Sequence, residues 1–239
     1  MKLSHSEYVA AVRRNGAGLL SAASLGLDAP TPCCPDWTVE QLVRHVGKVY
    51  AWVNLIVTTR ATSKPPERPK LGEGDPLALT GDQLDELVQH LAGDPEMPVW
   101  NWSGQPDDLA FWARRMAHES AIHRYDAQDA HGVAQPIDED LAADGIDELI
   151  DVIIPVGFTS DAVTTPGAIR LVSSEDGEWR LGISADGVER LDRSPEDATV
   201  VTGTSSDLLL AATGRIRWDS LDVGGDPGVL ETWTAALDF

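Results

Sequence analysis

The chain has little cysteine and no long apolar run, and these shortages argue against whole classes of protein. Among its 239 residues only Cys33 and Cys34 are cysteines, and they are neighbours, so a disulfide framework is not expected. No apolar run approaches the roughly 20 residues that a bilayer span requires, and the N-terminus lacks the apolar core of a signal peptide. We therefore expect a cytoplasmic protein with no membrane-spanning segment.

Basic residues are also scarce. Lys and Arg number 18 against 39 Asp and Glu, which gives a formal net charge of -21. Such an acidic chain repels phosphate backbones and anionic lipids, so nucleic acids and membrane surfaces are not expected as partners. What the chain does contain is 42% hydrophobic residues and eight Trp, which is enough for one large domain or two small ones.

Apolar residues recur at helical spacing through the first 150 residues. In the clearest example, Thr38 and Gln41 have the spacing of a capping box, and an apolar stripe follows through Leu42, Val46 and Val49. Stretches rich in proline or charge predict the loops between such segments. The predicted helices cover residues 4–25, 38–57, 81–93, 107–131 and 138–153, with loops over 26–36, 60–80 and 94–106.

The pattern changes after Pro155. Turn sequences and alternating residues now predict strands, so we place a domain boundary here, between an all-helical domain (residues 1–154) and a smaller α+β domain (residues 155–239). The second domain is predicted to contain two or three strands over 167–193, a strand over 198–204, a helix over 205–215 capped by Ser205 or Ser206, a strand or loop over 216–225, and a final helix opening with Pro227.

One predicted helix carries charged residues within its apolar stripe. Glu119 and His123 are four residues apart, so both project from the face that Trp112 and Met116 predict to be buried. Burying a lone charge is costly, and such groups are therefore paired with each other or bound to a metal. Spacing alone leaves both interpretations open, a structural Glu–His pair or a pair of metal ligands.

His45 lies at the edge of the apolar stripe of another predicted helix, between Leu42 and Val49. A lone histidine there is more often a hydrogen-bonded core residue than a ligand. Helical bundles, however, build metal sites from facing helices that each offer inward polar side chains. Two imidazoles and one carboxylate suit zinc, or another first-row metal, with one coordination position left open.

Three other residues fit a metal site less well. His118 and Glu119 begin like an HExxH protease motif, but His118 and His123 are five residues apart and so lie on different helix faces. We expect His118 to be solvated or to support the site indirectly. Arg124 is expected at the bundle edge, and Cys34, in a run of prolines, as a packed small residue rather than a nucleophile.

Two sequence blocks together carry a family resemblance. CPDWTVEQLVRHV (34–46) is followed later in the chain by HESAIHRYDAQDAHG (118–132). This combination resembles the mycothiol-dependent maleylpyruvate isomerase family of actinobacteria, and DLLLAATGR (207–215) resembles a recurring block of that family's second domain. The resemblance covers nearly the whole chain. It implies an α+β protein in which a DinB-like four-helix bundle precedes a smaller α+β domain related to sterol-carrier-type folds.

The resemblance also implies a site and a reaction. The family's His, Glu and His ligands fall on His45, Glu119 and His123, so we expect a divalent metal there, with zinc as the first choice. We expect mycothiol, a low-molecular-weight thiol, as co-substrate. The implied activity is a maleylpyruvate isomerase-like cis–trans isomerisation, in which the metal activates a thiol toward a small electrophile.

Other candidate residues each have two interpretations. Arg215, which ends the third block, suits the binding of a substrate carboxylate, or it balances a helix dipole. Asp126, one turn beyond the second histidine, orients an imidazole or makes a plain helix–helix hydrogen bond. Trp37, Trp100 and Trp102 line the pocket, or they belong to the core.

Alternative functions stay open at this point. One is a mycothiol S-transferase, or another DinB-type metal-dependent transferase or hydrolase, and another is a non-enzymatic binding module that keeps the metal for structure. Three protein ligands favour chemistry, because structural zinc sites are usually closed by four. The expected partners are a small-molecule substrate and a thiol, and the chain is expected to be a monomer or a homodimer.

Overall fold

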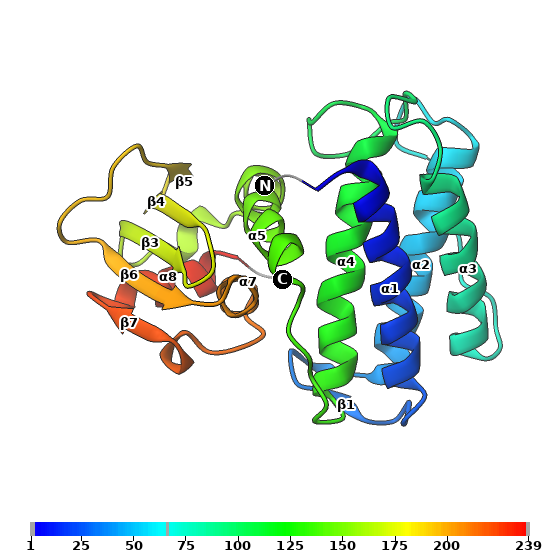
Figure 1. Cartoon of the computed structure of the whole chain (residues 1–239), viewed down its shortest axis with the longest axis horizontal. Helices are drawn as coiled ribbons and strands as arrows, with labels where there is room; N and C mark the ends of the chain where they lie inside the picture. Colours follow the sequence, from blue (N-terminus) through cyan, green and yellow to red (C-terminus); the bar gives the residue numbers. More distant parts are fainter. Residues whose placement is uncertain (1–2, 66, 238–239) are drawn as a thin grey trace. The chain divides into compact units, whose positions relative to one another are not determined.

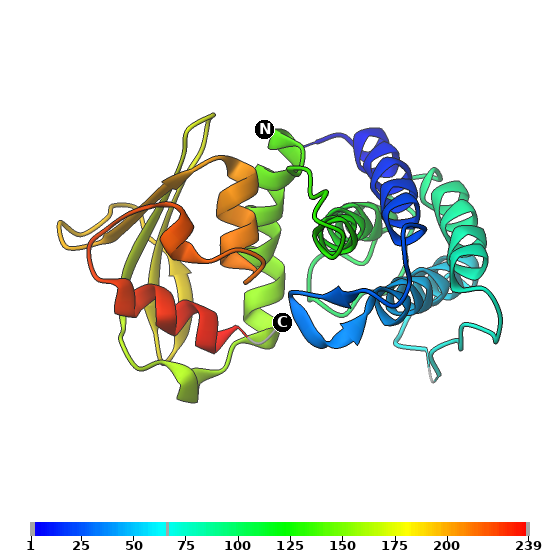
Figure 2. The ribbon, with the colours of Figure 1, turned by 90° about the horizontal axis from the view of Figure 1, so that it is seen from below.

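The computed structural model describes residues 3–65 and 67–237, which form two compact units that divide between Ile137 and Asp138. The first unit is helical apart from one short hairpin, and the second contains a five-stranded sheet with helices (Figures 1 and 2). The predicted α+β class is therefore confirmed. Among the described residues, no helix is both long and apolar enough to cross a membrane.

The first unit is a bundle of α1, α2, α3 and α4, which lie side by side in Figure 1. Helix α1 contacts α4 and α3, and α2 contacts α3 and α4. Two short strands, β1 and β2, pair as an antiparallel hairpin that begins in the segment predicted as a loop and extends two residues beyond it. The bounds are α1 His5–Ala23, β1 Pro30–Thr31, β2 Cys34–Thr38, α2 Val39–Thr58, α3 Pro76–Leu91 and α4 Leu109–Asp129.

Helix starts follow local capping chemistry. The side chain of Thr38 accepts a hydrogen bond from the backbone N–H of Gln41, whose own side chain accepts one from the N–H of Thr38, so the predicted capping box is confirmed. Helix α3 begins earlier than predicted, inside the expected loop. The reason is that Asp75 caps it and Pro76 occupies the first turn, where the missing N–H of proline costs nothing.

The second unit contains a mixed sheet of order β5-β4-β3-β6-β7, in which only β3 and β6 are parallel. Helices α7 and α8 both contact β3 and β6. The bounds are α5 Glu139–Glu148, a π-helical turn Leu149–Ile153, α6 Ile154–Gly157, a 3-10 turn Ser160–Ala162, β3 Gly167–Ser173, β4 Glu178–Ser184, β5 Gly187–Arg190, β6 Thr199–Gly203, α7 Ser205–Ala212, a 3-10 turn Trp218–Ser220, β7 Asp222–Gly224 and α8 Pro227–Ala236.

Two details of the second unit differ from the sequence predictions. The cap of α7 is Thr204, whose side chain accepts a hydrogen bond from the N–H of Asp207, rather than Ser205 or Ser206. Both serines are already inside the helix and are buried, and Ser205 Oγ lies 2.9 Å from Ser173 Oγ. Residues 204–206 all carry hydroxyl groups that can cap a helix, so the sequence does not show which of them precedes the first turn.

The division of the structure also lies before the predicted boundary at residue 155. Pro155 looks like a break in the sequence, but it occupies the first turn of α6, where a proline is tolerated. Helix α5 belongs with the sheet, because it packs on α7 and its Asp147 accepts a 3.0 Å hydrogen bond from Trp179 Nε1 in β4. The helical sequence pattern of α5 does not show which of the two units the helix packs in.

The close approach of α2 and α3 gives a test of the packing. At Gly47 an added Cβ would meet the hydroxyl of Thr80 and come within 2.9 Å of Leu71, and Thr80 is fully buried and donates to the carbonyl of Val43. We expect Gly47→Ala to lower the free energy of unfolding by about 1 kcal/mol or more, because overpacking outweighs the better helix propensity of alanine.

The measurement is urea unfolding of the whole chain followed by circular dichroism. Gly72→Ala is the matched control, because no atom lies within 4 Å of a Cβ there. Equal unfolding free energies for the two variants would contradict the packing described here.

Candidate metal centre

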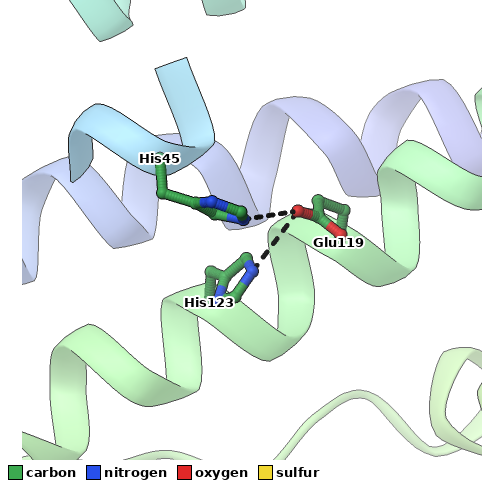
Figure 3. Close-up of side chains that lie close together, drawn as sticks. All are labelled: His45, Glu119 and His123. Atoms are coloured by element: carbon green, nitrogen blue, oxygen red, sulfur yellow. Dashed lines mark ion pairs between the residues drawn. The ribbon is translucent and has the colours of Figure 1, made fainter. Parts of the chain in front are cut away.

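Three side chains from two helices of the bundle converge on one point (Figure 3). His45 extends from α2, and Glu119 and His123 extend from α4, one helical turn apart. Glu119 Oε1 lies 3.5 Å from His45 Nε2 and 3.3 Å from His123 Nε2. One ligand atom from each residue lies within 4.8 Å of the others, the only such set of His, Cys, Asp or Glu found among the described residues.

These distances fit a small divalent metal. Two ligand atoms 2.0–2.1 Å from a tetrahedral zinc lie about 3.4 Å apart, close to the two observed nitrogen–oxygen separations. The donor set, two imidazoles and one carboxylate, is one that zinc and other first-row metals accept. The side chain of His45 is 40% exposed, whereas those of Glu119 and His123 are only 13% and 12% exposed, so the cluster is open to the surface beside His45.

A buried hydrogen bond next to the cluster joins α2 to α4. Tyr50 of α2 and Ser120 of α4 are both buried, and their hydroxyl oxygens lie 2.7 Å apart. Ser120 donates its proton to the carbonyl of Met116, so Tyr50 is the donor to Ser120. This hydrogen bond fixes the register of the two helices and thereby keeps His45 opposite Glu119.

Glu119 carries its negative charge inside the bundle. Burial by itself would raise the pKa of this carboxyl. The charge and hydrogen bond of His123 oppose burial most strongly, followed by the hydrogen bond of His45. Together with the charge of Arg115 they hold the pKa of Glu119 well below its ordinary value, so the carboxylate is ionised at neutral pH.

His123 is fixed from both ring nitrogens. Its Nδ1 lies 2.8 Å from Asp126 Oδ2, and the side chain of Asp126 is fully buried. Burial alone would lower the pKa of His123, but the charge of Glu119 and the hydrogen bond of Asp126 raise it to about 9. Asp126 therefore contacts the imidazole on the side away from Glu119, which is the contact expected of a residue that orients a ligand.

Arg115 is a member of the cluster that the sequence analysis missed. Its Nη2 lies 2.6 Å from Glu119 Oε2, the carboxylate oxygen that does not face the two imidazoles. A signal was present, because Arg115 precedes Glu119 by four residues and so lies on the same helix face. The spacing alone cannot show whether the guanidinium contacts that carboxylate or extends into solvent.

The three tryptophans predicted near the pocket separate into two places. The ring of Trp37, in β2, lies 5.1 Å from that of His45. Trp100 packs against Trp52 and Trp102 against Phe111. Trp52 is seven residues, or roughly 10 Å of helix, from His45, so Trp100 and Trp102 belong to an aromatic cluster at the other end of α2, and only Trp37 lies beside the ligands.

Three further residues lie outside the ligand cluster. His118 is buried and contacts the ring of Tyr8 in α1, so the expectation of a solvated side chain was wrong. Arg124 is buried rather than at the bundle edge, and it donates to the side chain of Gln128 and the carbonyl of Pro136. Cys34 is a half-buried free thiol whose sulfur lies 3.6 Å from that of Cys33.

Arg215 belongs to the second unit. Its backbone N–H bonds to the carbonyl of Leu210 directly after Gly214, whose φ of +74° ends α7. The guanidinium donates to the carbonyl of Thr213 at 2.8 Å, which is the contact that a helix-capping role predicts. Arg215 also lines a cavity of about 820 Å³ within this unit, together with Trp218 and Leu230.

Comparison with known proteins gives one family for both units. The model of the mycothiol maleylpyruvate isomerase N-terminal domain matches residues 9–128, and the model of the MDMPI C-terminal domain matches residues 140–232. The interval between the two matches contains the division of the structure. No curated protein matches the chain significantly.

Two solved structures share the fold of the whole chain. Both are crystal structures of mycothiol-dependent maleylpyruvate isomerase, one of them a histidine-to-alanine variant. The variant is 14% identical with a TM-score of 0.66, the other structure is 17% identical with a TM-score of 0.64, and each comparison covers 93% of both chains. The two family models span nearly all of the sequence, and the chain belongs to the mycothiol maleylpyruvate isomerase family.

Proposed function

We propose that this chain is a metal-dependent enzyme that uses mycothiol to isomerise a small cis-unsaturated keto acid of the maleylpyruvate type. The observation that carries the proposal is the convergence of His45, Glu119 and His123 at ligand distances in a member of this family. The names of the two similar structures support the thiol and the substrate class. Zinc is the metal we assign, because the donor set and the 3.3–3.5 Å separations suit it.

The reaction is a thiol addition followed by its reversal. Bound at this cluster, a divalent metal would lower the pKa of a thiol and so supply a thiolate at neutral pH. The thiolate sulfur bonds to one carbon of the double bond while the π electron pair moves onto the conjugated carbonyl oxygen. The resulting single bond rotates, and the return of the pair expels the thiolate and restores the double bond as the trans isomer. The thiol is regenerated, so no net oxidation or transfer occurs.

The residues of the chain position the reactants. His45, Glu119 and His123 are the ligands, and we assign Asp126 to orienting His123 through their 2.8 Å contact. The ring of Trp37 packs at a tilt against that of His45. The substrate is anionic in a strongly acidic protein, and we assign Arg215, with its forked donors, to binding a substrate carboxylate.

The test combines metal content with a thiol-dependent assay. We expect about one equivalent of metal in the purified chain and isomerisation of maleylpyruvate only when mycothiol is added. His45→Ala and Glu119→Ala should lose both the metal and the activity, because each removes one of three ligands. His131→Gln, two residues beyond the end of α4 and outside the cluster, should retain both.

Each outcome of this assay has a distinct meaning. Unchanged metal content in both ligand variants would refute the metal assignment. Consumption of mycothiol in proportion to product would identify a thiol S-transferase instead of an isomerase. A chain that unfolds when the metal is chelated, but whose metal site responds to no thiol, would be a binding module stabilised by metal.

The pKa of His123 predicts opposite effects of pH on stability and metal binding. Because the pKa of this residue is raised to about 9 from an ordinary 6.5, protonated His123 stabilises the metal-free fold below pH 6.5, and this stabilisation is lost as pH rises through about 9. A metal must displace the same proton, so metal affinity should rise over this pH range. Thermal melts of the metal-free chain and zinc titrations at several pH values measure the two effects.

Asp126→Asn is the informative variant for this behaviour. It removes the buried carboxylate that raises the pKa of His123, so the pH window should move toward neutrality, and metal affinity should fall about 10–100-fold. Asp129→Asn, on the same helix but outside the cluster, is the control. Identical pH profiles for Asp126→Asn and the wild type would show that Asp126 makes only a structural hydrogen bond.

Arg215 has its own kinetic test. If its guanidinium binds a substrate carboxylate, Arg215→Ala should raise KM for maleylpyruvate about tenfold or more, because a charge-assisted hydrogen bond contributes about 1.5–3 kcal/mol. Arg180→Ala is the matched control, because Arg180 belongs to the same unit, is paired with Glu178 and does not line the cavity that Arg215 lines. An unchanged KM together with a lower melting temperature would leave Arg215 as a helix cap that acts through its hydrogen bond to the carbonyl of Thr213.

A further inference from the structure

The two oxygens of the Glu119 carboxylate have different partners. Oε1 faces His45 Nε2 and His123 Nε2, whereas Oε2 is held by Arg115 at 2.6 Å. The side chains of Arg115 and Glu119 are only 15% and 13% exposed. One oxygen of the carboxylate therefore faces the candidate metal position, and a guanidinium binds the other.

An ordinary helix-stabilising ion pair explains this contact poorly. In helices the favourable order places the acidic residue before the basic one, in agreement with the helix dipole, and here Arg115 precedes Glu119. Such pairs also contribute little to stability at exposed positions. The Arg115 contact is instead mostly buried, short, and directed at an oxygen of the central carboxylate.

We propose that Arg115 is a positioning residue that restricts Glu119 to one ligating oxygen and so keeps a coordination position open for the thiol. This inference rests on the proposed function. A carboxylate can bind a metal through one oxygen or through both, and the second mode would occupy the position that a substrate thiol needs. Arg115 prevents the second mode, because its guanidinium already holds Oε2.

The same arrangement has a cost in metal binding. The positive charge of Arg115 lies next to the position of a cation, and it removes one oxygen from the possible ligands. Removal of Arg115 should therefore leave metal affinity equal or higher, while thiol binding weakens. A residue that only supports the fold would act in the opposite way, because its loss would lower metal affinity and leave the coordination unchanged.

The experiment uses cobalt(II) in the full-length chain, because its visible absorption reports coordination number. In the wild type we expect the strong bands of four-coordinate cobalt, and a sulfur-to-cobalt charge-transfer band when 2-mercaptoethanol is added. In Arg115→Met we expect a changed cobalt spectrum because the second carboxylate oxygen takes the fourth position, cobalt affinity no lower than the wild type, and thiol affinity reduced about tenfold or more, equivalent to roughly 1.4 kcal/mol. Arg115→Lys should recover part of the thiol affinity.

Arg44→Met is the matched control. It removes a guanidinium that is next to His45 in the sequence but is bound to Glu40 and to the carbonyl of Gly74. Its spectra should equal those of the wild type. If Arg115→Met shows the wild-type spectrum and thiol affinity, or if only its cobalt affinity falls, the inference is wrong while the metal site stands. If the wild type takes up no cobalt or zinc, the proposed function fails and the inference fails with it.

Discussion

The bundle depends on how the negative charge of Glu119 is compensated inside it. A carboxylate removed from water is strongly unfavourable unless partners meet its oxygens, and this one has partners on both, with His45 and His123 at Oε1 and Arg115 at Oε2. Those partners come from α2 and α4. The position of each helix is therefore constrained by the same charge.

Other contacts in the bundle fix the positions of α2 and α4. The Tyr50–Ser120 hydrogen bond fixes α2 against α4 with no solvent access, and the capping box at Thr38 fixes the start of the helix that carries His45. On the other side of α2, Gly47 lets α3 approach closely. The geometry of the cluster is thus supported by helices rather than by loops.

The two interpretations of the cluster, ion pair and metal site, describe the same atoms in different protonation states. In the metal-free chain a protonated His123 supplies the positive charge that Glu119 requires, which is why the pKa of the imidazole is raised and that of the carboxyl is lowered. A divalent cation would meet the same requirement with the proton removed. The cluster is therefore compatible with both states.

The sequence by itself determined the elements whose signals are local. Helical periodicity and capping residues placed α1, α2 and α4 nearly to their observed bounds, and the turn sequences placed β3, β4 and β5. Spacing put Glu119 and His123 on one face of one helix, because residues four apart must share a face. Two family blocks then supplied His45, which no periodicity could connect with residues more than 70 positions away.

Only the tertiary structure decided the contacts between elements. It joined α5 to the sheet, although the local pattern of α5 is that of any amphipathic helix, and it separated Trp37, beside His45, from Trp100 and Trp102. It also selected Arg115 among the arginines of α4 as the partner of Glu119 Oε2. Local chemistry fixes where helices and strands begin and end, but which side chains meet depends on how α2 packs against α4, and that is set by the core as a whole.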